Sequence, residues 1–198
     1  MMSLYIAVEG PIGVGKSSLT HMLADTLKME TLFEIVEENP FLSDFYEDIS
    51  KWSFQTEMFF LCNRYKQIND LGNRSVVSDY HVLKNKIFAR NTLDAKEYAI
   101  FEKIYAVMTE NLRQPDITIF LSAELPVLKK RIHKRKRDFE EAIADDYLLK
   151  LTEDYQSIYQ STPQALYIDT THLDFVHNPE DYEKILKQIM NLIGETHA

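Results

Sequence analysis

The residues with the clearest chemical meaning form a glycine-rich segment near the N-terminus: Gly10, Pro11, Ile12, Gly13, Val14, Gly15, Lys16, Ser17 and Ser18. Glycines let the backbone curl so that successive N–H groups point at one anion, and a helix beginning after them adds its positive end. In a G-x-x-x-x-G-K-S pattern, Lys16 reaches the β- and γ-phosphates and the Ser17 hydroxyl coordinates Mg²⁺. Because the pattern lies between a strand-like run and a helical one, we expect an ATP and Mg²⁺ site, shared by kinases, ATPases and GTPases.

Carboxylates and arginines further along the chain favour a kinase that acts on a small acceptor. Such an enzyme needs a carboxylate base near the acceptor hydroxyl, a carboxylate near the metal, and arginines that close over the transferring phosphoryl group. Glu34 fits the first role, and Asp79, with Ser17, fits the metal side. A basic run fits a lid at about residues 131–140, because guanidinium groups match phosphate oxygens and closure excludes water. The predicted catalytic lid residues are Arg131, Arg135 and Arg137.

The elements that must position these residues alternate between strand-like runs and longer helical stretches, a pattern typical of parallel βαβ units. The expected strands are 4–8, 34–36, 75–78, 117–121 and 166–168. The expected helices are 17–29, 52–71 and 83–112 (each as one helix or two), 125–136, 145–160 and 179–193. They predict an α/β fold: a three-layer α/β/α sandwich with a five-stranded parallel sheet, as in P-loop kinases. Sites in such sheets lie at the carboxyl ends of the strands, where Asp79 falls.

Length and composition favour one globular domain that spans residues 1–198, with 45% apolar and 27% charged residues. We expect no membrane span, because no run of eighteen apolar residues occurs, and no signal peptide. The formal net charge of −9 argues against a nucleic-acid partner. The single cysteine, Cys62, cannot form an internal disulfide, and its apolar neighbours predict a place in the core. We therefore expect a cytoplasmic protein.

Taken together, these motifs resemble the deoxyribonucleoside kinases over most of the chain. Glu34-Ile35-Val36 is similar to the family's catalytic Glu-Pro-Val, and Tyr46-x5-Trp52-Ser53-Phe54-x2-Glu57-x6-Arg64 matches a second segment. The basic run matches the family's R-x3-R-x-R lid. The resemblance implies that Glu34 takes the proton from the 5′-hydroxyl of a small-molecule deoxynucleoside. It also implies a homodimer formed by the helices around 52–70 and 83–112, with a heterodimer with a related kinase as the alternative.

The resemblance also implies roles for the residues that surround the nucleoside. The substrate-binding residues would be Glu34, Tyr46, Glu57, Arg64, Asp79, Asn85 and Glu140. Tyr46 and Glu140 would bind the sugar 3′-hydroxyl, whereas Glu57 and Arg64 would face the base. Asn85 would lie near the same edge of the base. Asp174 and Phe175 resemble the loop that holds the adenine of ATP.

One departure from the family follows the third strand. The family has Asp/Glu-Arg-Ser there, and this chain has Asp79-Tyr80-His81. Asp79 can still serve the metal and the 5′-hydroxyl, but the charge of the arginine must be missing or come from elsewhere, with Lys84 and Arg90 as candidates. The Asp-Tyr-His sequence resembles bacterial members of the deoxyguanosine kinase branch, which acts on deoxypurines.

Glu57 decides which nucleoside we expect. Glutamine, usual in the family, offers one donor and one acceptor, whereas a glutamate offers two acceptors that match guanine N1–H and its N2 amine. Arg64 can donate to guanine O6 and N7. The prediction is ATP-dependent conversion of 2′-deoxyguanosine to dGMP. The alternatives are a broader deoxypurine kinase that takes deoxyadenosine or deoxyinosine, a nucleoside monophosphate kinase, and a non-catalytic nucleotide-binding subunit. A GTPase is disfavoured, because Asn85-Lys86-Ile87-Phe88 lacks the aspartate of N-K-x-D.

Overall fold

A parallel sheet forms the centre of the computed structural model, which describes residues 3–135, 137 and 143–196. Its strands are β1 (Tyr5–Glu9), β2 (Glu30–Leu32), β3 (Val76–Ser78), β4 (Ile117–Ser122) and β5 (Ala165–Asp169). The helices are α1 (Lys16–Leu27), α2 (Leu42–Glu47), α3 (Ile49–Asn69), α4 (Leu83–Thr92), α5 (Ala95–Thr109), α6 (Leu125–Arg135), α7 (Asp145–Ser161) and α8 (Pro179–Thr196). The five strands lie in the order β2-β3-β1-β4-β5, and every pairing is parallel. The predicted fold class is confirmed.

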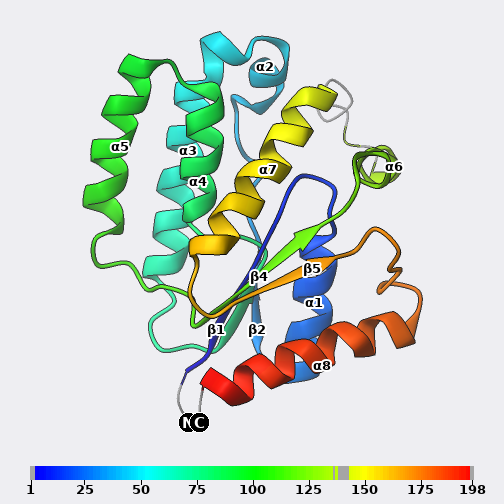
Figure 1. The fold of residues 1–198 in the computed structure, drawn as a ribbon. Helices are drawn as coiled ribbons and strands as arrows, with labels where there is room; N and C mark the ends of the chain where they lie inside the picture. The colour runs from blue at the N-terminus through cyan, green and yellow to red at the C-terminus, as the bar shows by residue number, and fades with distance from the viewer. Residues whose placement is uncertain (1–2, 136, 138–142, 197–198) are drawn as a thin grey trace.

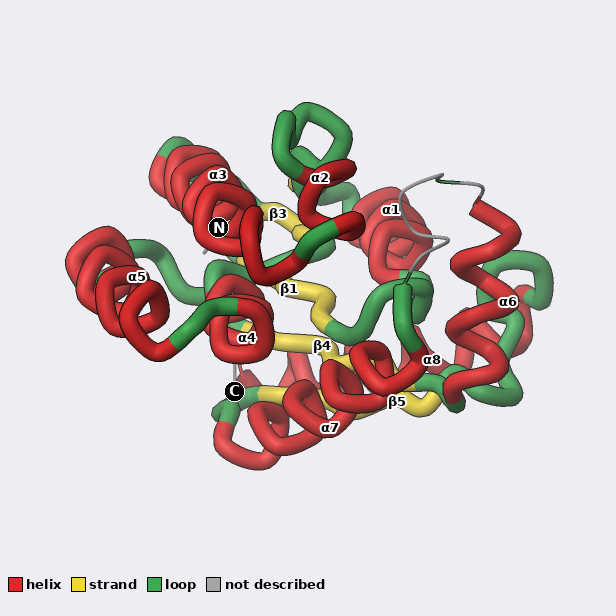
Figure 2. Tube along the Cα trace, turned by 90° about the horizontal axis from the view of Figure 1, so that it is seen from above, coloured by secondary structure: helices red, strands yellow, loops and turns green. Residues whose placement is uncertain are grey.

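Helices cover both faces of the sheet, because successive strand residues point to opposite sides. On one face, Ile6 and Val8 pack with apolar side chains of α1 and α8. On the other, Tyr5 and Ala7 pack with α3 and α5, and Phe120 packs with α7. Figure 2 shows α1 and α8 on one side of the strands and α3, α4, α5 and α7 on the other. All five residues of β1 are buried, so a central hydrophobic strand carries the glycine-rich loop.

The second strand differs from its prediction. Residues 34–36 lie in a loop, and β2 instead covers Glu30–Leu32, paired with β3. The strand lies at the sheet edge and none of its residues is fully buried, so it has no continuous apolar run to reveal it. Glu34 consequently lies just beyond the carboxyl end of a strand rather than within one, which is the end where parallel sheets build their sites.

The structure also shows where two helical stretches are divided. The stretch 83–112 forms two helices, because Asp94 caps the start of α5 by accepting a hydrogen bond from the backbone N–H of Glu97 at 2.8 Å. Tyr46 lies on the short helix α2, and Asp48 separates it from α3 as the N-cap of that helix. The prediction that Cys62 lies in the core is wrong, because its side chain is exposed on α3.

Candidate active site

The glycine-rich loop connects β1 to α1 (Figure 1). Gly13 and Gly15 have φ values of 84° and 106°, which side chains disfavour. A Cβ atom on Gly13 would also lie 2.8 Å from a backbone carbonyl of α6. The Lys16 ammonium donates to the carbonyls of Gly10 and Pro11 at 2.9 and 3.1 Å. Among the described residues no side chain caps α1, and its first turn has no acidic residue, so its positive end suits an anion.

Ser17 and Asp79 form a polar pair beside this loop. The Ser17 hydroxyl donates to Asp79 Oδ2 at 2.5 Å, and the other carboxylate oxygen accepts the backbone N–H of Glu34 at 2.8 Å. Burial, and then the charge of Glu34, raises the pKa of Asp79. Mg²⁺ is bound through one or two protein oxygens together with phosphates and water, so this hydroxyl and carboxylate fit it. The ion would neutralise charge on the phosphates. The described residues contain no cluster of three metal-ligating side chains.

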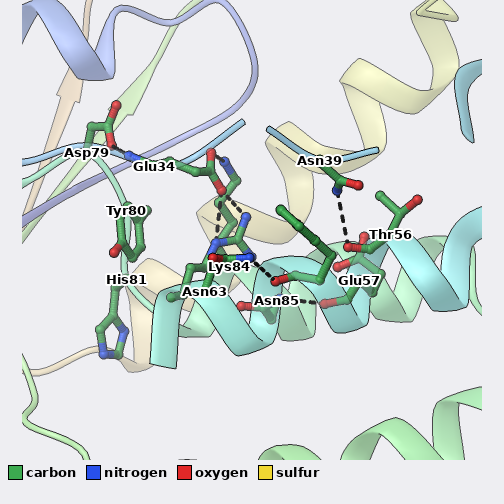
Figure 3. A network of polar contacts seen from close by, with 12 residues as sticks. Glu34, Asn39, Thr56, Glu57, Asn63, Asp79, Tyr80, His81, Lys84 and Asn85 are labelled. Atoms are coloured by element: carbon green, nitrogen blue, oxygen red, sulfur yellow. Dashed lines mark hydrogen bonds and ion pairs between the residues drawn. The ribbon is translucent and has the colours of Figure 1, made fainter. Parts of the chain in front are cut away.

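The Glu34 carboxylate is held by two cations, of which Figure 3 labels Lys84. Oε1 accepts from Arg64, whose Nε lies 2.9 Å away, and Oε2 accepts from the Lys84 ammonium at 2.6 Å. Burial alone would raise the pKa of Glu34, but the charges and hydrogen bonds of Arg64 and Lys84 outweigh it and hold the pKa far below its ordinary range. Glu34 is therefore an ionised acceptor with a fixed orientation.

Tyr80 and His81 turn away from this carboxylate (Figure 3). The Tyr80 ring is completely buried, and its hydroxyl donates to Gln67 Oε1 at 2.6 Å. The backbone N–H of His81 donates to Glu9 Oε1 at 2.6 Å. Of the two cations considered as replacements for the family's arginine, Lys84 contacts Glu34, whereas Arg90 is exposed on α4 and does not line the described cavity.

Glu57 and Arg64 lie at the far end of the cavity, where α3 contributes both side chains. Glu57 is only 2% exposed. Unpaired buried polar atoms gather here: among the described residues, Glu57 Oε2, Arg64 Nη1, Thr56 Oγ1 and the Tyr147 hydroxyl have no hydrogen-bond partner. Buried polar groups are normally paired, so this end is suited to a polar ligand.

Two other predicted substrate residues occupy different positions around this end. Tyr46 lines the cavity from α2. Asn85 is fully buried behind Glu57 and donates to its backbone carbonyl at 3.3 Å, and it is not among the described residues that line the cavity. The structure thus places Asn85 as a support for Glu57. Glu140 lies outside the described residues.

A single cavity of about 810 Å³ joins these groups to the glycine-rich loop and to α6. Phe175 is buried and is the nearest side chain to a Cβ built on Gly15. Asp174 is exposed and its carboxylate lies 2.9 Å from the His177 ring. Both residues line the cavity at its loop end, and the adenine-binding role of this segment stays a prediction.

The lid arginines are in different environments. Arg131 donates to the backbone carbonyls of Val14, Thr170 and Leu173 and to the Thr170 hydroxyl, so it fastens α6 to the phosphate loop. Arg135 is exposed at the end of α6 and lines the cavity. Arg137 also lines it and lies 3.6 Å from the Glu37 carboxylate.

Arg135 provides the test of the lid. Arg135→Met removes the charge from an exposed side chain, so we expect an intact fold and a kcat lowered about 10²-fold, the lower end of the range for one transition-state donor. The KM for the nucleoside should change much less, because charge on the phosphoryl group develops only in the transition state. Steady-state kinetics would measure both. Lys129→Met is the matched control, since Lys129 pairs with Asp145 on α7 and lies outside the cavity lining. Equal kinetics for the two variants would show that Arg135 has no role in phosphoryl transfer and that it is an ordinary solvated residue of α6.

Sequence reasoning missed two residues of the site. Glu9 directly precedes the loop and is buried. Burial is the main reason that its pKa is raised to about 7. Its position before Gly10 was the only available signal. Tyr147 lies on α7, its buried hydroxyl has no hydrogen-bond partner among the described residues, and Glu57 is close enough to help raise its pKa. No pattern in the sequence relates Tyr147 to Glu57, because the two residues lie on helices far apart in the chain. Only the fold shows that they are near each other.

The helices of the described part of the chain include none long and apolar enough to cross a membrane. The parallel sheet, the glycine-rich loop before α1 and the arginine-bearing α6 define the fold of a P-loop kinase. A sequence model described as deoxynucleoside kinase matches residues 6–194, and the chain belongs to this family of phosphotransferases.

Individual relatives span nearly the whole chain. A deoxyguanosine kinase of Bacillus subtilis (strain 168) is 42% identical, with 96% of this chain and 97% of the relative aligned. A deoxyadenosine kinase of Lactobacillus acidophilus is 33% identical, with 96% of each chain aligned. Among solved structures, the deoxyadenosine kinase from M. mycoides with bound dATP is similar at a TM-score of 0.83 and 27% identity, covering 94% of this chain and 98% of that one.

Proposed function

We infer that the protein transfers the γ-phosphoryl group of ATP to the 5′-hydroxyl of 2′-deoxyguanosine and forms dGMP and ADP, a reaction of purine deoxynucleoside salvage. The observation that carries this inference is the buried Glu57 carboxyl group beside Arg64 at the far end of the cavity. The relative at 42% identity is named a deoxyguanosine kinase, which supports it. Relatives named deoxyadenosine kinases keep a broader deoxypurine kinase as the second candidate.

The proposed roles follow the order of groups along the cavity. Lys16 and the loop N–H groups bind the ATP phosphates, and Ser17 and Asp79 hold Mg²⁺. Glu34 accepts the proton of the 5′-hydroxyl, and Lys84 supplies the positive charge that the family's arginine carries. Arg135 and Arg137 close over the phosphoryl group. Tyr46 and Glu140 bind the 3′-hydroxyl, and Asp174 and Phe175 hold the adenine of ATP.

Guanine fits the far end of the cavity by its pattern of donors. A carboxylate at Glu57 can accept from N1–H and from the N2 amine in a charge-assisted pair, and Arg64 Nη1, which has no partner among the described residues, can donate to O6. An ionised Glu57 would face the N1 lone pair of adenine, and a buried acceptor without a donor is costly. The preference for guanine therefore belongs to the ionised form of Glu57. A nucleoside monophosphate kinase would need a basic clamp for the phosphate of its acceptor, whereas the cations at this end, Arg64 and Lys84, are paired with Glu34.

Glu57→Gln tests the substrate by exchanging one oxygen for an NH₂ group. The new donor would oppose a guanine donor, so kcat/KM for deoxyguanosine should fall about ten- to a hundredfold, the range of a bidentate base contact. The value for deoxyadenosine should hold or rise, because the amide offers the donor–acceptor pair that adenine requires. Arg64 still favours O6, which limits a full inversion.

The measurement is the ratio of the two specificity constants in wild type and variant. Glu47→Gln is the matched control, because it makes the same exchange on an exposed carboxylate of α2 outside the cavity lining. If the ratio does not move in Glu57→Gln, the side chain does not contact the base, and deoxyguanosine loses its main structural support.

We also propose that the protein forms a dimer and lies in the cytoplasm. Apolar Ile100 and Val107 are exposed on α5, at 44% and 78%, and are seven residues apart, about two helical turns. A shared exposed face of this kind supports a homodimer through the predicted helices, or a heterodimer with a related kinase. A cytoplasmic location agrees with the salvage reaction proposed above.

A further inference from the structure

The Glu57 carboxyl group is buried in the protein, and the neighbouring cations form their ion pairs with Glu34 instead. It is 2% exposed, and its Oε2 has no hydrogen-bond partner among the described residues. The nearest guanidinium, Arg64 on the same helix, directs its Nε and one terminal nitrogen at Glu34. An isolated buried carboxylate is so unfavourable that such groups take up a proton instead.

Charged and titratable groups from several elements face this carboxyl group. Arg64 from α3 and Lys84 from α4 favour ionisation, but both cations already contact Glu34, whose negative charge opposes it. Tyr147 from α7 presents a buried hydroxyl that is neutral at ordinary pH, because burial raises its pKa well above the usual value. Burial therefore dominates over the two cations and raises the pKa of Glu57 to about 8.

We propose that Glu57 is a carboxylic acid in the free enzyme, releases its proton to solvent when a guanine nucleoside binds, and keeps it when an adenine nucleoside binds. This inference rests on the proposed function, because it assumes that the base of the substrate meets Glu57.

The two protonation states present different patterns to a purine. A carboxylic acid has one O–H donor and one acceptor, which match adenine N1 and its N6 amine. A carboxylate has two acceptors, which match guanine N1–H and its N2 amine. The same side chain can thus bind either base with its polar atoms paired, and the proton count distinguishes the two complexes.

The pH dependence of nucleoside affinity follows from whether binding releases a proton from Glu57 or keeps it. Below the pKa of about 8, guanine binding must displace a proton, so the affinity for deoxyguanosine should rise with pH, by up to about tenfold per unit between about pH 6 and 8. Deoxyadenosine binds the protonated form, so its affinity should stay level in that window and fall above it. The preference for guanine should consequently grow as the pH rises.

Isothermal titration calorimetry of the full chain at about pH 7, in two buffers of different ionisation enthalpy, counts the proton. We expect release of about one proton per deoxyguanosine bound to wild type and close to none per deoxyadenosine. Glu57→Gln should release close to none with either nucleoside. If the variant binds deoxyguanosine too weakly for calorimetry, the pH dependence of the two wild-type affinities gives the same information, because only the affinity for deoxyguanosine should rise between about pH 6 and 8.

The outcomes separate this inference from the proposed function. Binding of deoxyguanosine without proton release, or with equal release by wild type and Glu57→Gln, overturns the proton exchange and leaves the kinase assignment in place. Equal pH slopes for the two nucleosides also overturn it. Failure of the wild type to bind either nucleoside overturns both.

Discussion

Lys16→Ala should lower kcat about 10³-fold or more, because it removes the point charge at the β- and γ-phosphates, and one transition-state donor is typically worth 10²–10³. In this structure the ammonium contacts only backbone carbonyls of the loop among the described residues. It also lies near the like charge of Lys84; burial, and then this charge, lowers its pKa to about 7. Its loss should therefore leave the fold intact, and phosphoryl transfer is measured by nucleotide product formation.

The control for this variant is Lys187→Ala, which removes an exposed lysine from α8. Both proteins should melt cooperatively at similar temperatures, and only Lys16→Ala should lose activity. If Lys16→Ala retained most of the wild-type turnover, the assignment of the glycine-rich loop to ATP phosphates would be wrong.

Glu34→Gln should reduce kcat about 10²- to 10⁴-fold, the usual contribution of a general base. The amide keeps the shape but cannot accept the 5′-hydroxyl proton. It also leaves the buried cations Arg64 and Lys84 beside a neutral group, so we expect a lower melting temperature as well, since breaking a buried ion pair is destabilising. Kinetics should be measured where circular dichroism shows the variant folded, and nucleoside binding should be largely kept.

Glu37→Gln is the matched control for the base. Glu37 lies three residues later in the same loop, its side chain is 74% exposed, and its only charged neighbour among the described residues is Arg137. We expect near-normal turnover. The opposite pattern, loss with Glu37→Gln and activity with Glu34→Gln, would mean that the family match at this loop is displaced by three residues.

The sequence predicted the parts of the fold that depend on local pattern. The fully buried β1 and β4 appeared as apolar runs, and the glycine-rich loop appeared as a motif between a strand and a helix. The edge strand β2 could not be found this way, because its side chains are only partly covered and its position depends on pairing with β3. The break at Asp94 depends on one capping hydrogen bond, which competes with the helical periodicity on either side.

The residues singled out in the sequence lie together, but their partners were not predictable and their roles stay predictions. Glu34, Asp79, Glu57 and Arg64 do meet around one cavity. That both cations would contact Glu34 was not predictable, because it depends on how α3 and α4 face the loop after β2. The exposure of Cys62 likewise depends on which side of α3 faces the sheet.

Consecutive side chains at the end of β3 point to opposite sides of the sheet, and this arrangement affects which substitutions the site can accept. Asp79 faces the phosphate loop, whereas Tyr80, the next residue, is packed into the opposite layer (Figure 3). The carboxylate proposed to hold Mg²⁺ and the cation that pairs with Glu34 therefore come from separate elements, the end of a strand and the first turn of α4. A substitution in one element should leave the other in place, so the source of the positive charge beside Glu34 can change without a change at Asp79.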